Sequence, residues 1–170
     1  MKSSTNIIDR IELIQSINTI KNLKFKYWNA CDSKKPADIL ASFWAEDVYI
    51  NFEDFGIFSS AQDMVTKYEL RSCHGHLIEQ HAGKNPIIKL SSRNEALGFW
   101  SLSYSLIDTL KTISLSISGT YEDLYIRDEN ENWFIKKTIF KKKASMYRSL
   151  TSGQCSNPRI GKSLTSKKTV

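Results

Sequence analysis

The sequence lacks any apolar run that approaches the roughly 18 residues needed to cross a bilayer. Its first residues, MKSSTNIIDRIELIQ, also lack the unbroken apolar stretch of a secretory signal. We therefore expect a soluble, cytoplasmic protein with no membrane span.

Cysteine, proline and glycine are scarce, with 3, 3 and 7 residues among 170. Cys31, Cys73 and Cys155 form neither a CxxC pair nor an even set, which argues against a disulfide framework and against a zinc site. The low glycine and proline content excludes fibrous and low-complexity classes, and 41% hydrophobic residues suffice for one apolar core. We expect a single domain of ordinary size.

Acidic residues are absent from the last thirty positions. Residues 141–170 hold eight Lys and Arg residues, whereas residues 1–140 hold 16 basic and 18 acidic ones, so the net charge of +6 comes from the C-terminal end. Residues 149–170 are rich in Ser, Thr, Gly and Lys without a hydrophobic period, which is typical of a disordered segment. We expect a domain over residues 1–148 followed by a flexible basic tail over residues 149–170.

Nucleic-acid binding is the function that such a basic tail first suggests, because lysines attract phosphate. Sheets that bind RNA combine aromatic and basic residues on one strand face, and no predicted strand shows that pattern. A solvated terminus is the simpler interpretation. We expect no specific nucleic-acid partner.

The first 72 residues are mainly helical in pattern. Apolar residues at spacings of three and four predict an amphipathic helix over residues 7–30. Pro36 fits a first helical turn, so a short second helix is predicted over residues 36–44, before a strand over residues 48–52. Ser60 is a typical N-cap, and the segment AQDMVTKYELRS after it predicts a third helix.

The later part of the chain consists of β-branched and aromatic runs separated by the turn signals SSRN and RDENEN. Helices followed by antiparallel strands predict an α+β fold, in which a helical layer packs on a strongly bent sheet and buries the aromatic rings. The predicted strands cover residues 77–80, 87–90, 96–106, 112–127 and 133–143.

One predicted strand has an unusual polar face. Ile113 and Leu115 share one side of it, and Ser114 and Ser116 share the other. A face exposed to water would usually carry Lys and Glu, so the uncharged row suggests a covered surface such as a subunit contact. We expect a homodimer or homotrimer.

Motifs of a known family follow one another along the chain. Tyr27 is followed five residues later by Asp32, and the pair Phe43 and Asp47 follows. Farther on come HAGKNPI from residue 81, GTYEDLY from residue 119 and NWFI from residue 132. In this order and over about residues 8–143, the chain resembles the SnoaL-like branch of the nuclear-transport-factor-2-like superfamily.

The resemblance implies a cone-shaped curved antiparallel sheet, wrapped by about three N-terminal helices around a deep pocket for small, often polycyclic or polyketide-derived molecules. Related members include steroid isomerases, polyketide cyclases, scytalone dehydratase and bile-acid dehydratases, which run acid–base chemistry without a required cofactor. Other members only bind or associate, so the fold alone does not decide the activity.

Tyr27, Asp32 and His81 are the candidate catalytic residues. Five residues rotate a helix by about 140°, so Tyr27 and Asp32 converge only if the helix ends near residue 31, as the following SKKP suggests. A histidine can take and return a proton near neutral pH, and a buried aspartate beside it fixes its tautomer. The alternatives are that Asp32 solvates the helix end, that Tyr27 belongs to the core and that His81 has no role.

Metal binding is not expected, although His74 and His76 lie close to His81 in the sequence. In an extended strand the first two would share a face and His81 would point to the other. The chain also has no histidine after His81, unlike the scytalone-dehydratase-like pattern with a second histidine on the next long strand. Asp108 could replace that histidine, but a turn residue is the simpler interpretation.

Aromatic residues could form a pocket wall for a flat apolar substrate, although such spacings also occur in plain cores. The candidate substrate-binding residues are Trp28, Trp44, Phe55, Phe58, Trp100 and Tyr104.

These observations together predict a cofactor-independent acid–base enzyme for a small hydrophobic oxygenated molecule, with dehydration, isomerisation or cyclisation as the reaction. The alternative is a non-catalytic small-molecule-binding or dimerisation module whose pocket is filled by side chains.

Overall fold

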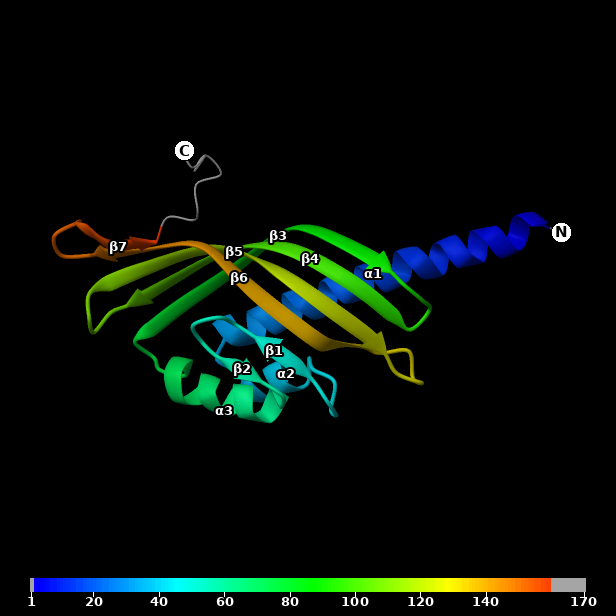
Figure 1. Cartoon of the computed structure of the whole chain (residues 1–170), viewed down its shortest axis with the longest axis horizontal. Coiled ribbons are helices and arrows are strands. Elements are labelled where there is room, and N and C mark those ends of the chain that lie inside the picture. The colour runs from blue at the N-terminus through cyan, green and yellow to red at the C-terminus, as the bar shows by residue number, and fades with distance from the viewer. Residues whose placement is uncertain (1, 160–170) are drawn as a thin grey trace, which may run out of the picture.

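The computed structural model describes the backbone of residues 2–159, and the side chains of residue 7 and of residues 9–155. Helices precede most of the strands, and a curved sheet wraps around the interior (Figure 1), so the predicted α+β cone is confirmed. The helices are α1 (Lys2–Asp32), α2 (Pro36–Leu40) and α3 (Ala61–Ser72). The strands are β1 (Tyr49–Asn51), β2 (Ile57–Phe58), β3 (Leu77–Leu90), β4 (Glu95–Asp108), β5 (Ile113–Arg127), β6 (Trp133–Ser149) and β7 (Cys155–Arg159).

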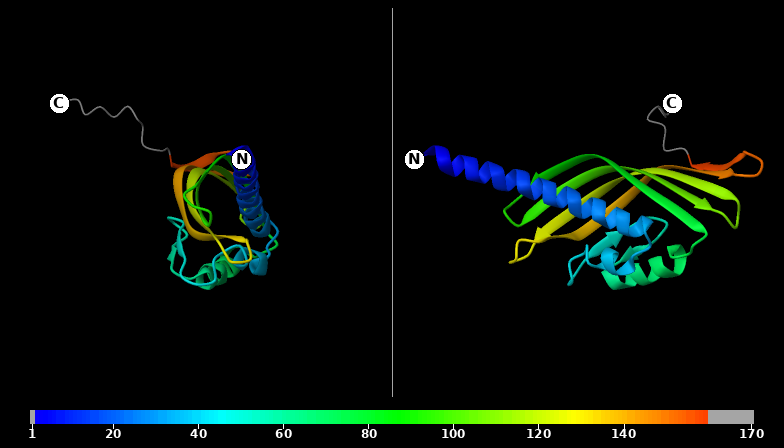
Figure 2. Two further views of the ribbon diagram at one scale, coloured as in Figure 1. Left: turned by 90° about the vertical axis from the view of Figure 1, so that its right-hand side faces the viewer. Right: turned by 180° about the vertical axis from the view of Figure 1, so that it is seen from behind.

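The sheet has the strand order β2-β1-β6-β5-β4-β3, and β7 pairs with β6. Strands β3 to β6 form an antiparallel meander, whereas β1 runs parallel to β6. In the end-on view of Figure 2 the long strands curve around the interior, with α1 along the open side and the shorter helices at the foot. The N-terminal end of α1 extends beyond the sheet.

The end of α1 is fixed by a Schellman motif. The Lys35 backbone N–H donates to the Ala30 carbonyl at 2.9 Å, and that of Lys34 donates to the Cys31 carbonyl at 3.1 Å. Lys34 occupies the left-handed region with φ 56°, where glycine is more common. The helix therefore ends at Asp32, close to the residue at which the sequence predicts its end.

The second predicted helix is wrong in extent. The helix stops at Leu40 instead of continuing to residue 44. The chain pairs there with β6, because the Trp44 N–H donates to the Ile135 carbonyl and the Ile135 N–H donates to the Ser42 carbonyl, each at 3.0 Å. The third helix is confirmed, since the Ser60 side chain accepts a hydrogen bond from the Asp63 N–H at 3.2 Å.

The two short strands predicted over residues 77–80 and 87–90 form one strand, β3. Its ladder with β4 shifts register between Lys84 and Ile87, where Asn85 has φ 51° and Pro86 has no N–H to donate. The residues that indicated a break thus form a β-bulge within a continuous strand.

The segment predicted as a tail from residue 149 begins at the last residue of β6 and then turns back to form β7. Arg148 pairs with Cys155 and Tyr147 with Ser156 in the β6–β7 ladder. This pairing uses backbone groups, so no hydrophobic period in the side chains reveals it. Residues 160–170 lie outside the described part of the chain.

The core lies under α1, against the middle of the sheet. Trp28 and Trp100 pack edge to face with ring centroids 5.3 Å apart. Beneath them Lys24 and Asp123 are both fully buried, with Lys24 Nζ 2.9 Å from Asp123 Oδ2. Tyr125 and Thr138 each donate a hydroxyl hydrogen bond of 2.7 Å to Asp123, so the buried carboxylate is well satisfied.

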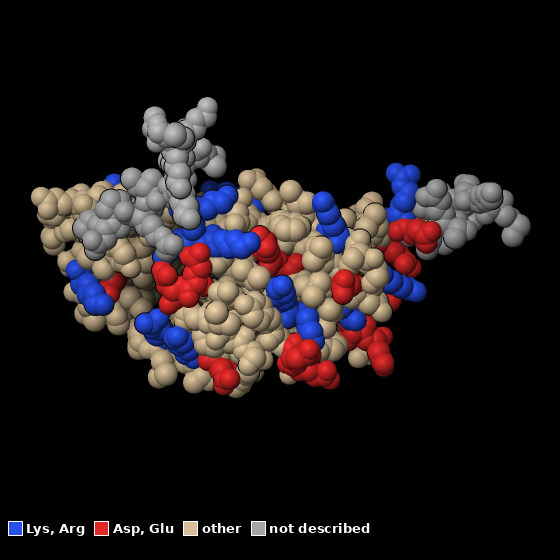
Figure 3. All heavy atoms as spheres, viewed as in Figure 1, with Lys and Arg blue, Asp and Glu red and all other residues tan. Residues whose placement is uncertain are grey.

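Charged side chains of both signs are intermixed on the face drawn in Figure 3. Lys141, near the C-terminal end of the domain, has an acidic partner, since its Nζ lies 2.5 Å from Glu122 Oε1. No helix among the described residues is both long and apolar enough to pass through a membrane.

Candidate active site

A cavity of about 420 Å³ opens between the concave face of the sheet, the end of α1, helix α3 and the loop between β1 and β2. Its size is typical of small-molecule sites. Apolar side chains from each of these parts line most of it, among them Ile39, Phe52, Met64, Leu102, Leu115, Ile117, Tyr121 and Phe140. Leu115 and Ile117 face the cavity, so Ser114 and Ser116 on the alternate positions face away from it.

Asp32 and His81 meet at the edge of this cavity. The His81 Nδ1 atom lies 2.6 Å from Asp32 Oδ1, and the His81 backbone N–H donates to both carboxylate oxygens at 3.0 and 3.1 Å. A carboxylate can only accept, so Nδ1 carries the proton and Nε2 is left as an acceptor in the neutral ring. The His81 side chain is 14% exposed and lines the cavity.

Tyr27 also lines the cavity, one turn and a half before Asp32 on α1. Burial raises the pKa of Tyr27 well above its usual value, and the neighbouring Cys31 raises it further. Burial likewise raises the pKa of Cys31 to about 12. Near pH 7 both groups are therefore neutral, and the phenol is available as a hydrogen-bond donor.

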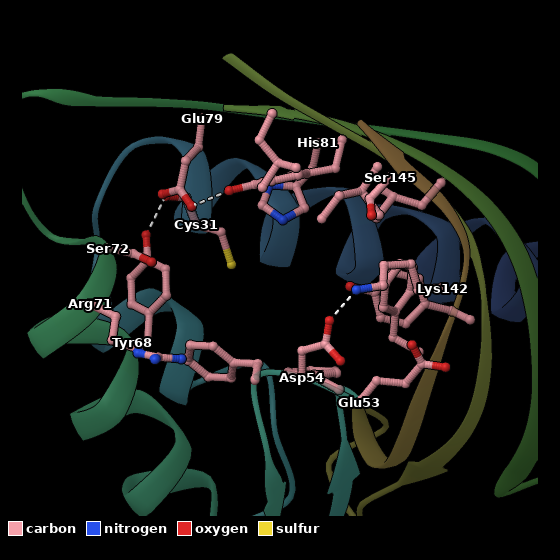
Figure 4. A pocket seen from close by; sticks show the side chains of 18 of the residues that line it. Cys31, Glu53, Asp54, Tyr68, Arg71, Ser72, Glu79, His81, Lys142 and Ser145 are labelled. Atoms are coloured by element: carbon pink, nitrogen blue, oxygen red, sulfur yellow. Dashed lines mark hydrogen bonds and ion pairs between the residues drawn. The ribbon is translucent and has the colours of Figure 1, made fainter. Parts of the chain in front are cut away.

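A second carboxylate, Glu79, lies on the same strand face as His81. It accepts a hydrogen bond of 2.6 Å from the Tyr104 hydroxyl and forms an ion pair with Lys34. The Tyr104 ring also contacts the His81 ring, with centroids 4.8 Å apart. Burial raises the pKa of Tyr104, so its phenol stays protonated. Figure 4 shows Glu79, Cys31 and His81 along one side of the cavity.

Lys142 lies on another side, where its ammonium group pairs with Asp54 of the β1–β2 loop (Figure 4). Sequence reasoning did not select Lys142 or Glu79 as site residues. Glu79 lies two residues before His81, so strand alternation alone places both on one face. No comparable signal singles out Lys142 within Lys141, Lys142 and Lys143.

The predicted aromatic wall is only partly assembled. Phe55 and Tyr104 line the cavity. Trp28 and Trp100 are instead buried in the core, each 2% exposed, and Trp44 packs edge to face on Phe134. Phe58 packs against Phe55, so it supports the wall without lining it.

The remaining candidates lie outside the cavity. His74 and His76 stack on each other in the loop before β3, with ring centroids 5.4 Å apart. The carboxylate of Asp108 accepts backbone hydrogen bonds from Leu110 and Lys111, as expected of a turn residue. No group of three or more potential metal ligands occurs among the described residues.

Comparison with known proteins now decides the family. The model of the SnoaL-like domain matches residues 12–139, which is most of the chain. The protein belongs to the SnoaL-like family. The predicted resemblance is thus confirmed, whereas a search of curated proteins finds no match.

Solved structures of several other proteins have the same fold at low sequence identity. A putative scytalone dehydratase from Novosphingobium aromaticivorans has a TM-score of 0.71 and 15% identity, covering 92% of this chain and 97% of its own. A hexachlorocyclohexane dehydrochlorinase, LinA-type3 from Novosphingobium barchaimii, has a TM-score of 0.69 and 15% identity, and the match covers 78% of this chain and 90% of that one. ActVI-ORFA from Streptomyces coelicolor has a TM-score of 0.62 and 9% identity, and the match covers 74% of this chain and 95% of that one. At such identities the likeness shows the fold.

Proposed function

We propose that the protein is a cofactor-independent acid–base enzyme that acts on a small hydrophobic oxygenated molecule. The observation that carries this proposal is the Asp32–His81 pair at the edge of an open, mostly apolar cavity. The alternative binding module would have a pocket filled by side chains, whereas the described residues leave the cavity open. We propose dehydration as the reaction, with isomerisation or cyclisation as variants of the same proton transfer.

In this mechanism Nε2 of His81 removes a proton from the carbon next to a substrate carbonyl. Asp32 acts as a positioning residue, because it holds Nδ1–H and stabilises the imidazolium that forms. The Tyr27 phenol donates a hydrogen bond to the carbonyl oxygen, where negative charge develops.

The electron pair of the broken C–H bond then forms a C=C bond as the C–O bond to the β-hydroxyl breaks. The imidazolium returns its proton to the departing oxygen, which leaves as water. In an isomerisation the same proton returns to a different carbon. General base catalysis of this kind contributes about 10²- to 10⁴-fold in rate.

Two of the similar solved structures support an elimination, because their names describe a dehydratase and a dehydrochlorinase. The homo-oligomer suggested by the serine face also remains a prediction, and size-exclusion chromatography with light scattering tests it.

The acid–base proposal is tested by proton exchange on 1-tetralone, a flat bicyclic ketone, followed by NMR in D₂O. We expect the protein to accelerate exchange at the carbon next to the carbonyl, and His81→Ala to lose at least about tenfold of this acceleration. His76→Ala is the matched control, since His76 lies outside the cavity. Exchange that is absent, or equal in the His81→Ala variant, would contradict the proposal.

A further inference from the structure

Lys142 faces the cavity directly before a β-bulge in β6. The β5–β6 register shifts between Ser118 and Gly119, so that Ser118 pairs with Ala144 and Gly119 with Lys142, and Lys143 is the additional residue. Phe140 and Lys142 line the cavity before the bulge, and Ser145 lines it after the bulge. A bulge of this kind re-aims side chains and is common next to active sites.

The environment of Lys142 is unusual for a lysine. Its side chain is only 10% exposed, and the cavity wall beside it includes the rings of Phe140 and Tyr121. A charged ammonium group in such surroundings needs an anionic or strongly polar partner. A ligand that fills the cavity next to Lys142 must therefore either pair with the ammonium group itself or leave the ion pair of Lys142 with its present partner intact.

The present partner is Asp54, whose side chain is 70% exposed. It lies in the tight loop between β1 and β2, where Glu53 and Gly56 have positive φ angles of 43° and 138°. An ion pair with so exposed a carboxylate contributes little free energy, because water solvates that carboxylate well when the pair separates. Asp54 can thus be exchanged for another anion at small cost.

We propose that Lys142 binds an anionic oxygen group of the ligand, a carboxylate in the simplest case, which takes the place of the Asp54 carboxylate. The ligand is then an acid with a flat apolar body. The proposal deepens the proposed function, on which it rests for the role of the cavity as a substrate site.

The sheet topology places this anion subsite away from the proposed base. His81 is on β3 and Lys142 on β6, with β4 and β5 between them. Strands lie about 4.8 Å apart, so three strand spacings of about 14 Å in total separate the two residues across the curved sheet, in addition to their offset along the strands. Leu102 and Tyr121 line the cavity on the strands between them and provide the apolar surface for the ligand body.

Glu53 and Asp54 of the β1–β2 loop are the acidic residues that line the cavity on the side of Lys142, so a ligand anion competes with this loop for the ammonium group. The Glu79 carboxylate is paired with Lys34, and it lies on β3 rather than beside Lys142. Arg71 of α3 adds a second positive charge to the cavity lining. Figure 4 places Arg71 and Lys142 on different sides, so an acid can meet a positive charge from either direction.

The test compares 2-naphthoate with its neutral analogue 2-naphthamide, using isothermal titration calorimetry at low salt. We expect the wild-type protein to bind the acid about tenfold more tightly, as a charge-assisted hydrogen bond would give. Lys142→Met should lose this preference but still bind the amide, whereas Lys142→Arg should keep it. Asp54→Asn should bind the acid more tightly than the wild type does, because the competing carboxylate is gone.

Lys141→Met is the matched control, because Lys141 is the next residue on the strand, is 55% exposed and pairs with Glu122. It should keep the preference for the acid. Equal affinity for the two probes, including binding of neither, or an unchanged preference in Lys142→Met, would overturn the proposal. These measurements need no turnover, so their failure leaves the His81 exchange test untouched, and failure of that test leaves the preference for the acid intact.

Discussion

Asp32 accepts hydrogen bonds from both the backbone N–H and the imidazole Nδ1 of His81, which fixes the strand and the ring with one carboxylate. We expect ¹⁵N NMR of the wild-type protein to show that, when the His81 ring is neutral, its proton is on Nδ1 and not on Nε2. Asp32→Asn should disturb this tautomer and lower the exchange of 1-tetralone by about 10²-fold, because the imidazolium loses its anionic partner. An unchanged tautomer with full exchange would contradict the positioning role of Asp32.

Cys31 illustrates how the cavity suppresses reactivity. Burial raises the pKa of its thiol to about 12, so almost no thiolate exists between pH 7 and 10. Iodoacetamide should therefore label the exposed Cys155 and leave Cys31 unmodified until urea unfolds the protein, as peptide mass spectrometry would show. Rapid labelling of Cys31 in the folded Cys155→Ser variant would contradict this prediction.

The same raised pKa of Cys31 makes stability depend on pH. The folded state keeps the thiol proton up to about pH 12, whereas the unfolded state loses it above about pH 9. The unfolded state is then favoured as pH rises, so the free energy of unfolding should fall across this range. Urea denaturation at pH 8 and pH 10.5 should show a smaller decrease for Cys31→Ala than for the wild type.

Lys24 and Asp123 form an ion pair that is fully buried. Removal of one partner leaves an uncompensated charge in the core, so Lys24→Met should lower the free energy of unfolding by about 3–5 kcal/mol. Lys24→Met combined with Asp123→Leu should lose less than this single variant. Urea denaturation of the two single variants and the double variant measures these losses. A loss in the double variant equal to the sum of the two single losses would show that the two charges are not coupled.

Gly83 provides a test of the packing behind the cavity. A Cβ atom at this position would lie 1.9 Å from Trp28 Cζ3, so Gly83→Ala must displace the indole from its contact with Trp100. We expect a loss of about 1–3 kcal/mol in urea denaturation. Gly75→Ala is the matched control, since a Cβ atom there meets nothing within 4 Å, and an equal effect of the two variants would contradict this account.

The fold and the Asp32–His81 pair could be predicted because motifs that resemble a known family mark them along the chain, although the two residues are 49 positions apart. The end of α1 follows from the residues after Cys31, and the alternation of the later strands is plain in the sequence. The depth of a side chain is not local, which is why Trp28 and Trp100 were assigned to the pocket wall although they pack on each other in the core. Lys142 stands among three successive lysines, so no contrast between apolar and polar residues shows which of them faces the cavity.

The extra residue at Lys143 has a wider consequence. Because Gly119 pairs with Lys142 and Ser118 with Ala144, deletion of Lys143 would give a continuous ladder in which Lys142, Ser145 and Tyr147 keep their places in the cavity wall. The bulge is thus a position at which a relative of this protein can lose one residue without rebuilding its binding site.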